Sequence, residues 1–274
     1  MPAEVSTAAD LLPDAIRPAW AAPAHVTALM STRQGGVSQA PFDSLNLRPP
    51  GLRGGDADDP AAVLHNQQRF AAALGARPVW LNQVHGAQVL RLSAGLPRDA
   101  LPQADASVCT EPGIACAVLV ADCLPVLLCT DDGSGVAAAH AGWRGLAGGV
   151  LDNTVAALCQ ATGRAPAGLL AWLGPCIGST AFEVGEDVLQ AFAADPVRPD
   201  PGLFVARRRA DGSPAWLANL PALARQRLLA LGVARISGGG WCTVANASRF
   251  FSFRRDRRCG RLAAGIALRR SGPL

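Results

Sequence analysis

Three short apolar runs that follow one another near the middle of the chain constrain its fold more than any other feature. They read "IACAVLVA" (114–121), "PVLLCT" (125–130) and "GVAAAHA" (135–141), and the polar segment "TDDGSG" separates the last two. Runs of this length bounded by turn residues are typical of buried strands, and an Asp-Gly pair between two such runs is a strong hairpin signal. The sequence therefore predicts a β-hairpin whose turn is centred near Asp132 and Gly133.

Strand-like and helical segments also occur outside this hairpin. The helices are expected over residues 60–74 (stopping at Gly75), 146–162, 185–194 and 219–231. The further strands are expected over residues 79–84, 87–92, 168–174, 233–237 and 263–269, with a surface loop over 48–60. Because strands cluster first and helices enter later, the pattern favours an α/β fold of the α+β layered kind, with a mixed sheet and hairpins flanked by helices. We expect a single domain over residues 25–270 that follows an N-terminal extension of residues 1–24.

The composition limits the partners and the compartment of such a domain. The 274 residues are half hydrophobic and carry a net charge of only +4, so nucleic acid is not an expected partner, whereas an anionic small molecule fits. The longest apolar run is interrupted by Asp122 and Pro125, and the N-terminal residues have no basic region before an apolar core, so neither a membrane span nor a signal peptide is predicted. Eight cysteines without paired C-x-x-C spacing indicate reduced thiols. We expect a cytoplasmic protein, either a monomer or a small homo-oligomer.

Two of the four histidines end strand-like runs beside glycine, in "NQVHG" and "AAAHAGWRG", and Cys123 interrupts a third apolar run. A turn near residues 132–133 pairs residues whose numbers sum to about 263–265, which predicts that Cys123 lies nearly opposite His140. A thiolate and an imidazole at that separation suit two ligands of one Zn²⁺, with His85 as the natural third ligand. Three protein ligands leave an open position, which is typical of catalytic zinc sites.

The same residues permit a second interpretation. A nucleophilic Cys123–His140 pair without metal uses the same two side chains, so the spacing alone barely separates it from a metal site. A single histidine at a strand end is usually structural, and a single cysteine in an apolar run is usually a core residue. No compact ligand motif of the C-x-x-C or H-E-x-x-H kind is present to decide between these interpretations.

Several arginines that lie beside glycines or other motifs indicate recognition of an anion. Arg33 in "TRQGGVS" precedes a Gly-Gly turn, Arg144 lies four residues after His140, and Arg254 and Arg255 follow "FFSF". Guanidinium groups bind phosphate or carboxylate through two parallel hydrogen bonds, and glycines let backbone N–H groups approach the same anion. The pattern favours a phosphate or ribose-phosphate site.

Nine motifs together resemble the bacterial laccase-domain family, also called the multicopper polyphenol oxidase-like or peptidoglycan editing factor family. In chain order they are "TRQGGVS", "FDSLNL", "GDADDP", "NQVHGAQV", "ADCLPVLL", "AAHAGWRG", "LGPCIG", "FEVGEDV" and "FFSFRRD…GR". The resemblance runs from about residue 25 to residue 268. It implies a single α/β domain and a zinc-dependent purine nucleoside phosphorylase, which uses adenosine, guanosine, inosine and methylthioadenosine and also deaminates adenosine.

The resemblance also implies roles for individual residues. It assigns the metal ligands to His85, Cys123 and His140, the three residues that the spacing selects. Next to this site, Asp122 is expected either to carry a proton or to orient a ligand histidine. The expected partners are a purine nucleoside and phosphate, and the residues expected to bind them are Arg33, Ser44, Asn46, Arg144 and Arg255. The sequence departs from its relatives where they often carry tyrosine (Phe42, Phe182 and Phe253), glycine (Arg48) or threonine (Cys259).

Three other functions are compatible with these residues. The name peptidoglycan editing factor implies an amidase or hydrolase that removes an amino acid from a nucleotide-linked muramyl precursor. A copper-dependent polyphenol oxidase is the second, but four histidines and the methionines Met1 and Met30 cannot build a multicopper cluster, so copper is an alternative to zinc only at a mononuclear site. The third, a non-enzymatic binding role, leaves Asp122, Cys123 and His140 without an explanation.

Overall fold

Thirteen strands in the described part of the chain form three sheets in a computed structural model, which describes residues 12–52 and 57–269. The largest sheet is mixed and has the order β12 (Arg235–Gly238), β8 (Leu169–Leu173), β6 (Leu124–Thr130), β7 (Val136–Ala141), β4 (Ala106–Cys109) and β3 (Val89–Arg91). A four-stranded sheet has the order β1 (Val26–Met30), β13 (Leu262–Leu268), β5 (Ile114–Val120) and β2 (Arg77–Val79). The expected layered α/β class is confirmed, and the strands are divided among several sheets.

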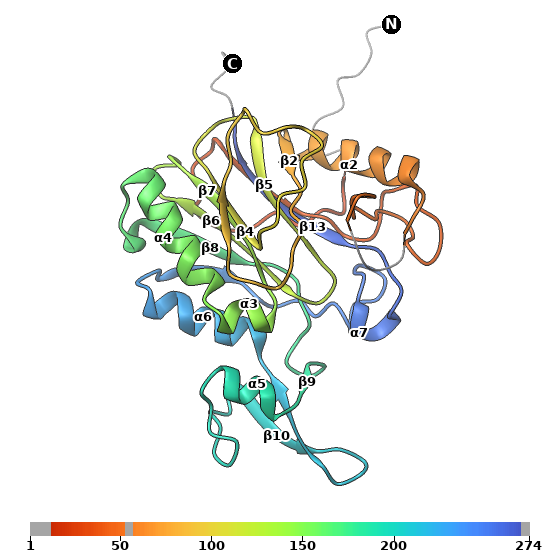
Figure 1. The fold of residues 1–274 in the computed structure, drawn as a ribbon, viewed down its shortest axis with the longest axis vertical. Helices are drawn as coiled ribbons and strands as arrows, with labels where there is room; N and C mark the ends of the chain where they lie inside the picture. The colour runs from red at the N-terminus through yellow and green to blue at the C-terminus, as the bar shows by residue number, and fades with distance from the viewer. Residues whose placement is uncertain (1–11, 53–56, 270–274) are drawn as a thin grey trace, which may run out of the picture.

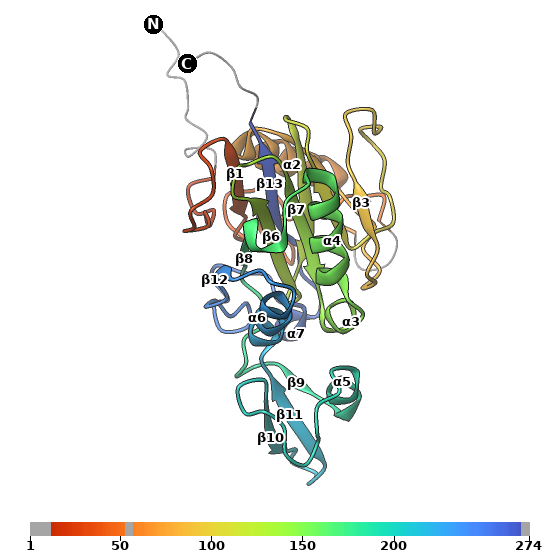
Figure 2. The ribbon, with the colours of Figure 1, turned by 90° about the vertical axis from the view of Figure 1, so that its left-hand side faces the viewer.

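The two larger sheets pack face to face, with helices on both outer faces (Figure 2). Alternate side chains of β5 show the arrangement: Cys116 and Val118 point into the core between the sheets, whereas Ala115 and Leu119 point toward helix α2 (Pro60–Leu74). On the far side, α4 (Val150–Thr162) and α6 (Leu220–Ala230) cover the six-stranded sheet, with the short α3 (Trp143–Ala147) beside them. Both sheets are therefore buried on two faces, which explains the continuous apolar runs of their central strands.

The local signals of the sequence predict the central elements closely. Strands β5, β6 and β7 lie within one residue of the expected ranges. Helix α2 matches the expected range, because Asp59 accepts a hydrogen bond from the N–H of Ala61 at its start and Gly75 ends it in the left-handed conformation. The helix expected over 146–162 is instead two helices, α3 and α4, because Gly149 adopts a φ of 89° between them.

Smaller elements were missed by the sequence patterns. Strands β1 and β4 and the short helices η1 (Pro166–Gly168) and α7 (Phe253–Asp256) were not predicted. Strands β9 (Glu183–Val184), β10 (Phe204–Arg208) and β11 (Pro214–Ala218) form a third, antiparallel sheet that projects from the main body together with α5 (Glu186–Ala191) (Figure 1). Most side chains of β10 are exposed, so this strand lacks the apolar pattern that marks the central strands.

Part of the N-terminal extension packs on the domain. Ile16 pairs with Met30 at the end of β1, and Leu12 is buried beside α2. The rest of the extension, residues 1–11, lies outside the described residues, as do residues 53–56 of the expected surface loop. None of the described helices combines the length and the apolar character that crossing a membrane requires.

Candidate metal centre and its cavity

The hairpin of β6 and β7 brings Cys123 close to His140, although not directly opposite it. Residues paired across the two strands have numbers that sum to 265, so Pro125 is the partner of His140 and Leu124 is the partner of Ala141. Cys123 lies just before β6 and is therefore a diagonal neighbour of His140. The register follows from the turn, which is symmetrical about the peptide bond between Asp132 and Gly133.

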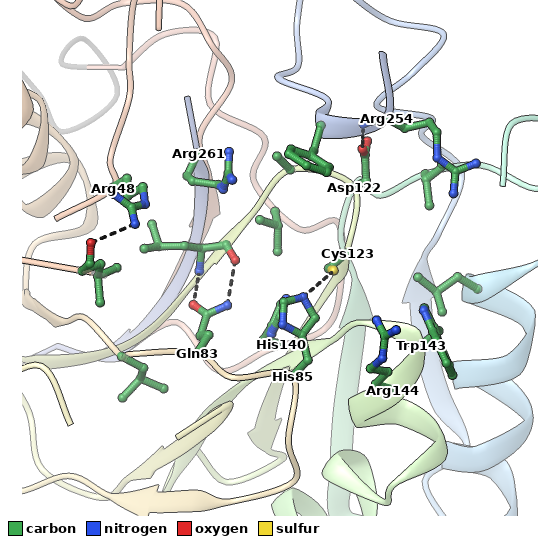
Figure 3. A pocket seen from close by; sticks show the side chains of 18 of the residues that line it. Arg48, Gln83, His85, Asp122, Cys123, His140, Trp143, Arg144, Arg254 and Arg261 are labelled. Atoms are coloured by element: carbon green, nitrogen blue, oxygen red, sulfur yellow. Dashed lines mark hydrogen bonds between the residues drawn. The ribbon is translucent and has the colours of Figure 1, made fainter. Parts of the chain in front are cut away.

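His85 completes a group of three metal-ligating side chains with Cys123 and His140 (Figure 3). One ligand atom of each residue lies within 4.8 Å of those of the other two. The Sγ of Cys123 is 3.8 Å from Nε2 of His85, and the two imidazole rings are 4.8 Å apart at 74°. His140 is buried whereas His85 is exposed, so the group lies where the protein interior meets a cavity. Two imidazoles and a thiolate are donors that suit Zn²⁺ and Cu²⁺.

A loop between β2 and β3 carries His85 to this position. The side-chain amide of Gln83 accepts a hydrogen bond from the backbone N–H of Leu119 and donates one to its carbonyl, both at 2.8 Å, which attaches the loop to β5. His85 itself has a φ of 59°, in the left-handed region that residues with a side chain rarely adopt. Such a conformation persists only when its surroundings hold it.

The carboxylate of Asp105 stabilises this conformation of His85 through hydrogen bonds to the backbone around it. It accepts hydrogen bonds from the backbone N–H groups of Val84, His85 and Gly86 at 3.2, 2.9 and 2.7 Å. It also lies 2.8 Å from Nδ1 of His140. Burial by itself raises the pKa of Asp105, but the hydrogen bonds from His140 and Gly86 outweigh it, so the net pKa is lowered. One buried anion thus positions two of the three candidate ligands.

Sequence reasoning missed Asp105. A signal was available, because Asp105 immediately precedes the apolar run "ASVC" that becomes β4, as Asp122 and Cys123 precede β6. Asp105 reaches its partner His140 because β4 pairs with β7, and no local turn predicts this pairing.

The glycines around Trp143 leave room for the three ligands. A Cβ atom on Gly142 would lie 2.9 Å from Sγ of Cys123 and 3.1 Å from the ring of His85. A Cβ atom on Gly145 would lie 2.8 Å from the carbonyl oxygen of Gly86. The motif "HAGWRG" therefore ends a strand on a ligand and then lets the chain pass directly against the other two.

The charges of Cys123 and His140 depend on each other. Burial raises the pKa of Cys123, but the charge and hydrogen bonds of His140 and the hydrogen bond of His85 lower it to about 6. Burial lowers the pKa of His140, but the Cys123 thiolate and the hydrogen bond to Asp105 raise it to about 9. Without a metal ion, the arrangement favours a thiolate beside an imidazolium at neutral pH.

A cavity of about 680 Å³ opens over the three ligands, a volume within the usual range for small-molecule sites. The arginines that line it are Arg48, Arg144, Arg254, Arg257 and Arg261. Among the described residues, Asp122 is the only acidic group in the lining. Trp143 and Phe253 add aromatic surface, and the guanidinium of Arg144 lies 4.4 Å from the centre of the Trp143 ring. The cavity is therefore strongly electropositive and suits an anionic or partly anionic ligand.

Asp122 lines the cavity but is bonded to neither histidine ligand. It accepts hydrogen bonds from the hydroxyl of Thr243 and the backbone N–H of Arg254, both at 2.6 Å. Its φ of 98° is in the left-handed region. The carboxylate thus joins the start of β6 to α7, while the contact with a ligand histidine that the sequence suggested for Asp122 is made by Asp105.

Of the residues expected to bind substrate, only Arg144 lines the cavity. Arg33 is bonded to Asp43 and to the carbonyl of Ala247, and Arg255 to Asp256 and to three backbone carbonyls. Ser44 is bonded to backbone groups of Gly36 and Arg33, and Asn46 is buried. The lining residues Arg48, Arg257 and Arg261 were not selected from the sequence.

Fold and site together define an α/β protein with a candidate mononuclear metal centre in the wall of an arginine-lined cavity. Residues 27–269 match the multi-copper polyphenol oxidoreductase laccase family, and the chain belongs to this family. The four histidines do not gather at one place: His25 is bonded to the carbonyl of Gly133 and His65 is exposed on α2. In the described residues, His85, Cys123 and His140 form the one group of three or more candidate metal ligands.

Known proteins similar to this chain cover nearly its whole length. Purine nucleoside phosphorylase YfiH of Escherichia coli is 49% identical over 92% of this chain and 98% of its own. Purine nucleoside phosphorylase PA4543 of Pseudomonas aeruginosa is 48% identical with the same coverage. The crystal structure of protein NMB0706 of Neisseria meningitidis, 44% identical, superposes with a TM-score of 0.82 over 93% of this chain and 99% of that chain.

Proposed function

We propose that the protein is a zinc-dependent purine nucleoside phosphorylase that accepts adenosine, guanosine, inosine and methylthioadenosine, and that it also deaminates adenosine. The names of relatives nearly half identical to the chain support the phosphorylase activity. The observation that carries the proposal is the position of His85, Cys123 and His140 in the wall of a cavity lined by arginines. Phosphorolysis requires a site for phosphate and a proton donor or other electrophile that assists the leaving base.

The donors of the candidate centre support zinc as the metal. His85 and His140 would bind it through imidazole nitrogens and Cys123 through its thiolate, and three protein donors of these types leave the open position that is typical of catalytic zinc. When bound, zinc supplies a Lewis acid beside the reacting atoms. Because Nδ1 of His140 is hydrogen-bonded to Asp105, Nε2 is the nitrogen of that ring that would bind the metal.

The residues around the centre would position the reactants. Arg144, which lies on α3 four residues after His140, would hold phosphate against the anomeric carbon of the ribose. Arg33 and Arg255 would not contact the reactants directly, since their guanidinium groups are bonded to Asp43 and Asp256 and to backbone carbonyls. For Asp122 we propose an anchoring role, because one of its oxygens accepts a short hydrogen bond from Thr243 and the other accepts one from the backbone N–H of Arg254 on α7.

The test uses protein loaded with one equivalent of zinc and incubated with adenosine, inosine or methylthioadenosine, with and without phosphate. Free base is expected to form only when phosphate is present, together with ribose 1-phosphate from adenosine or inosine and 5-methylthioribose 1-phosphate from methylthioadenosine. Inosine is expected to form from adenosine in either case. Cys123→Ala is expected to abolish metal binding and turnover together, whereas Cys159→Ala, which changes a thiol on α4, is the matched control. Full activity of metal-free Cys123→Ala protein would refute the proposal.

Two arms of the same experiment address the alternative functions. Metal analysis of protein purified without added metal distinguishes zinc from copper, and a copper-loaded sample assayed with a polyphenol tests the oxidase. A nucleotide-linked muramyl amino acid tests the amidase. We expect neither polyphenol oxidation nor amide cleavage to approach the rate of nucleoside phosphorolysis.

A further inference from the structure

Two cavity arginines from distant parts of the chain are attached to the same buried side chain. The oxygen of the Asn46 amide accepts hydrogen bonds from the backbone N–H groups of Arg48 and Arg261, at 3.2 and 2.9 Å. The N–H of Leu47 also donates to the carbonyl of Arg261. Asp58 in turn accepts a hydrogen bond from the Asn46 nitrogen at 2.9 Å, which fixes the orientation of the amide. The two arginines are therefore held next to each other.

The side chains of these arginines line the cavity. Figure 3 shows Arg48 and Arg261 on one side of the three metal-ligating residues and Arg144 on the other. Arg257 joins the first two, since its guanidinium and that of Arg261 each lie 5.9 Å from the centre of the Phe253 ring. The cavity thus has two separate cationic regions.

Arg261 has donor groups to spare for a ligand. Its Nη1 donates to the carbonyls of Cys259 and Gly260, at 3.0 and 3.1 Å. Within the part of the chain that the structure describes, Nε and Nη2 of Arg261 have no hydrogen-bond partner. A half-buried guanidinium with two N–H groups on one edge is suited to a tetrahedral oxyanion, which it binds through two parallel hydrogen bonds.

We propose that Arg48, Arg257 and Arg261 form a second anion subsite of the cavity, which binds a phosphate group apart from the one that Arg144 would hold. Asn46 is the positioning residue of this subsite, because it fixes the backbone of two of the three arginines. The phosphate group has two sources: the 5′-phosphate of a purine nucleotide, or inorganic phosphate. The use of either in phosphorolysis rests on the proposed function, but the binding itself does not.

The test is calorimetric titration of the zinc-loaded full chain with inosine, inosine 5′-monophosphate and inorganic phosphate. Arg48→Gln and Arg261→Gln are each expected to weaken binding of a phosphate-bearing probe by about tenfold or more, the usual effect of losing a charge-assisted hydrogen bond. Arg98→Gln, which removes an exposed arginine outside the cavity, should leave binding unchanged. Thermal unfolding monitored by circular dichroism verifies that each variant folds. If Arg261→Gln does not fold, Arg261→Lys replaces it in the titrations.

The two sources give different results. If the nucleotide supplies the phosphate, the variants reduce the preference for inosine 5′-monophosphate over inosine and leave the affinity for inorganic phosphate unchanged. If inorganic phosphate is the ligand, its affinity falls and the nucleotide preference does not change. The proposal is overturned if neither probe responds to Arg48→Gln or Arg261→Gln while Arg144→Gln weakens the binding of both. The titration measures binding and not turnover. If phosphate binds at the second subsite but the activity assay yields no ribose 1-phosphate, only the proposed function is refuted.

Discussion

Nδ1 of His140 lies 2.8 Å from a carboxylate oxygen of Asp105, and both side chains are almost completely buried. The hydrogen bond fixes the ring orientation and leaves Nε2 available to a metal. The same carboxylate accepts the backbone N–H of His85, so one side chain positions both histidines. Contacts of this kind raise the affinity of a metal site without touching the metal.

The first prediction concerns Asp105→Asn. The amide retains the shape of the carboxylate but loses its charge and one acceptor, so we expect zinc affinity to fall by about 10–100-fold. Competition with a chromophoric chelator measures the affinity. Asp99→Asn, at an exposed position, is the control. An unchanged affinity in folded Asp105→Asn protein would show that the carboxylate does not position the ligands.

Substitution of Gly142 tests the space beside the ligands. The Cβ atom of Gly142→Ala would lie 2.9 Å from Sγ of Cys123, a separation at which an atom must move. We expect the variant to fold and to bind less than one equivalent of metal under conditions that saturate the wild type, as measured by mass spectrometry of the native protein. Gly240→Ala is the matched control, because a Cβ atom there meets nothing within 4 Å. Equal metal content in both variants would contradict the prediction.

The pH dependence of alkylation tests the charge of Cys123. In metal-free protein its pKa is lowered to about 6, so the thiolate is present above this pH and is lost only as the pH falls below it. The rate of reaction with iodoacetamide, measured by peptide mass spectrometry, should be half-maximal near pH 6, compared with about 8.5 for an unperturbed cysteine. Burial raises the pKa of Cys129 to about 12, so its peptide is the internal control. A rate that rises only above pH 8 would contradict this prediction.

Asp122→Ala separates anchoring from a role at the metal. The substitution leaves the buried hydroxyl of Thr243 and the N–H of Arg254 without their acceptor, so we expect the free energy of unfolding to fall by about 2–4 kcal/mol. Urea denaturation measures this change. Zinc affinity should stay within about twofold of the wild type, because Asp122 is not bonded to either histidine ligand. A large loss of zinc affinity at unchanged stability would instead favour the role beside a ligand histidine.

Local patterns explain which parts of the fold were predictable. The hairpin and α2 have their signals within a few residues, in a symmetrical turn, an N-terminal Asp59 and a C-terminal Gly75. The same reasoning selected Cys123 and His140. In the structure they are diagonal neighbours across the hairpin, not directly opposite residues. Strands β1 and β4 have no such signal, because they are defined by partners far away in the sequence.

The sequence by itself determined the donor chemistry of the site: two histidines and a cysteine, of which Cys123 and His140 are brought together by one turn. Tertiary structure alone decided which charged groups surround them. Asp105 reaches His140 through the pairing of β4 with β7, and Asn46 holds Arg261 next to Arg48. Arg33 and Arg255 are instead bonded to carboxylates and backbone carbonyls. The physical reason is that a turn dictates its register over a few residues, while an arginine faces a cavity or a carbonyl according to how distant segments pack.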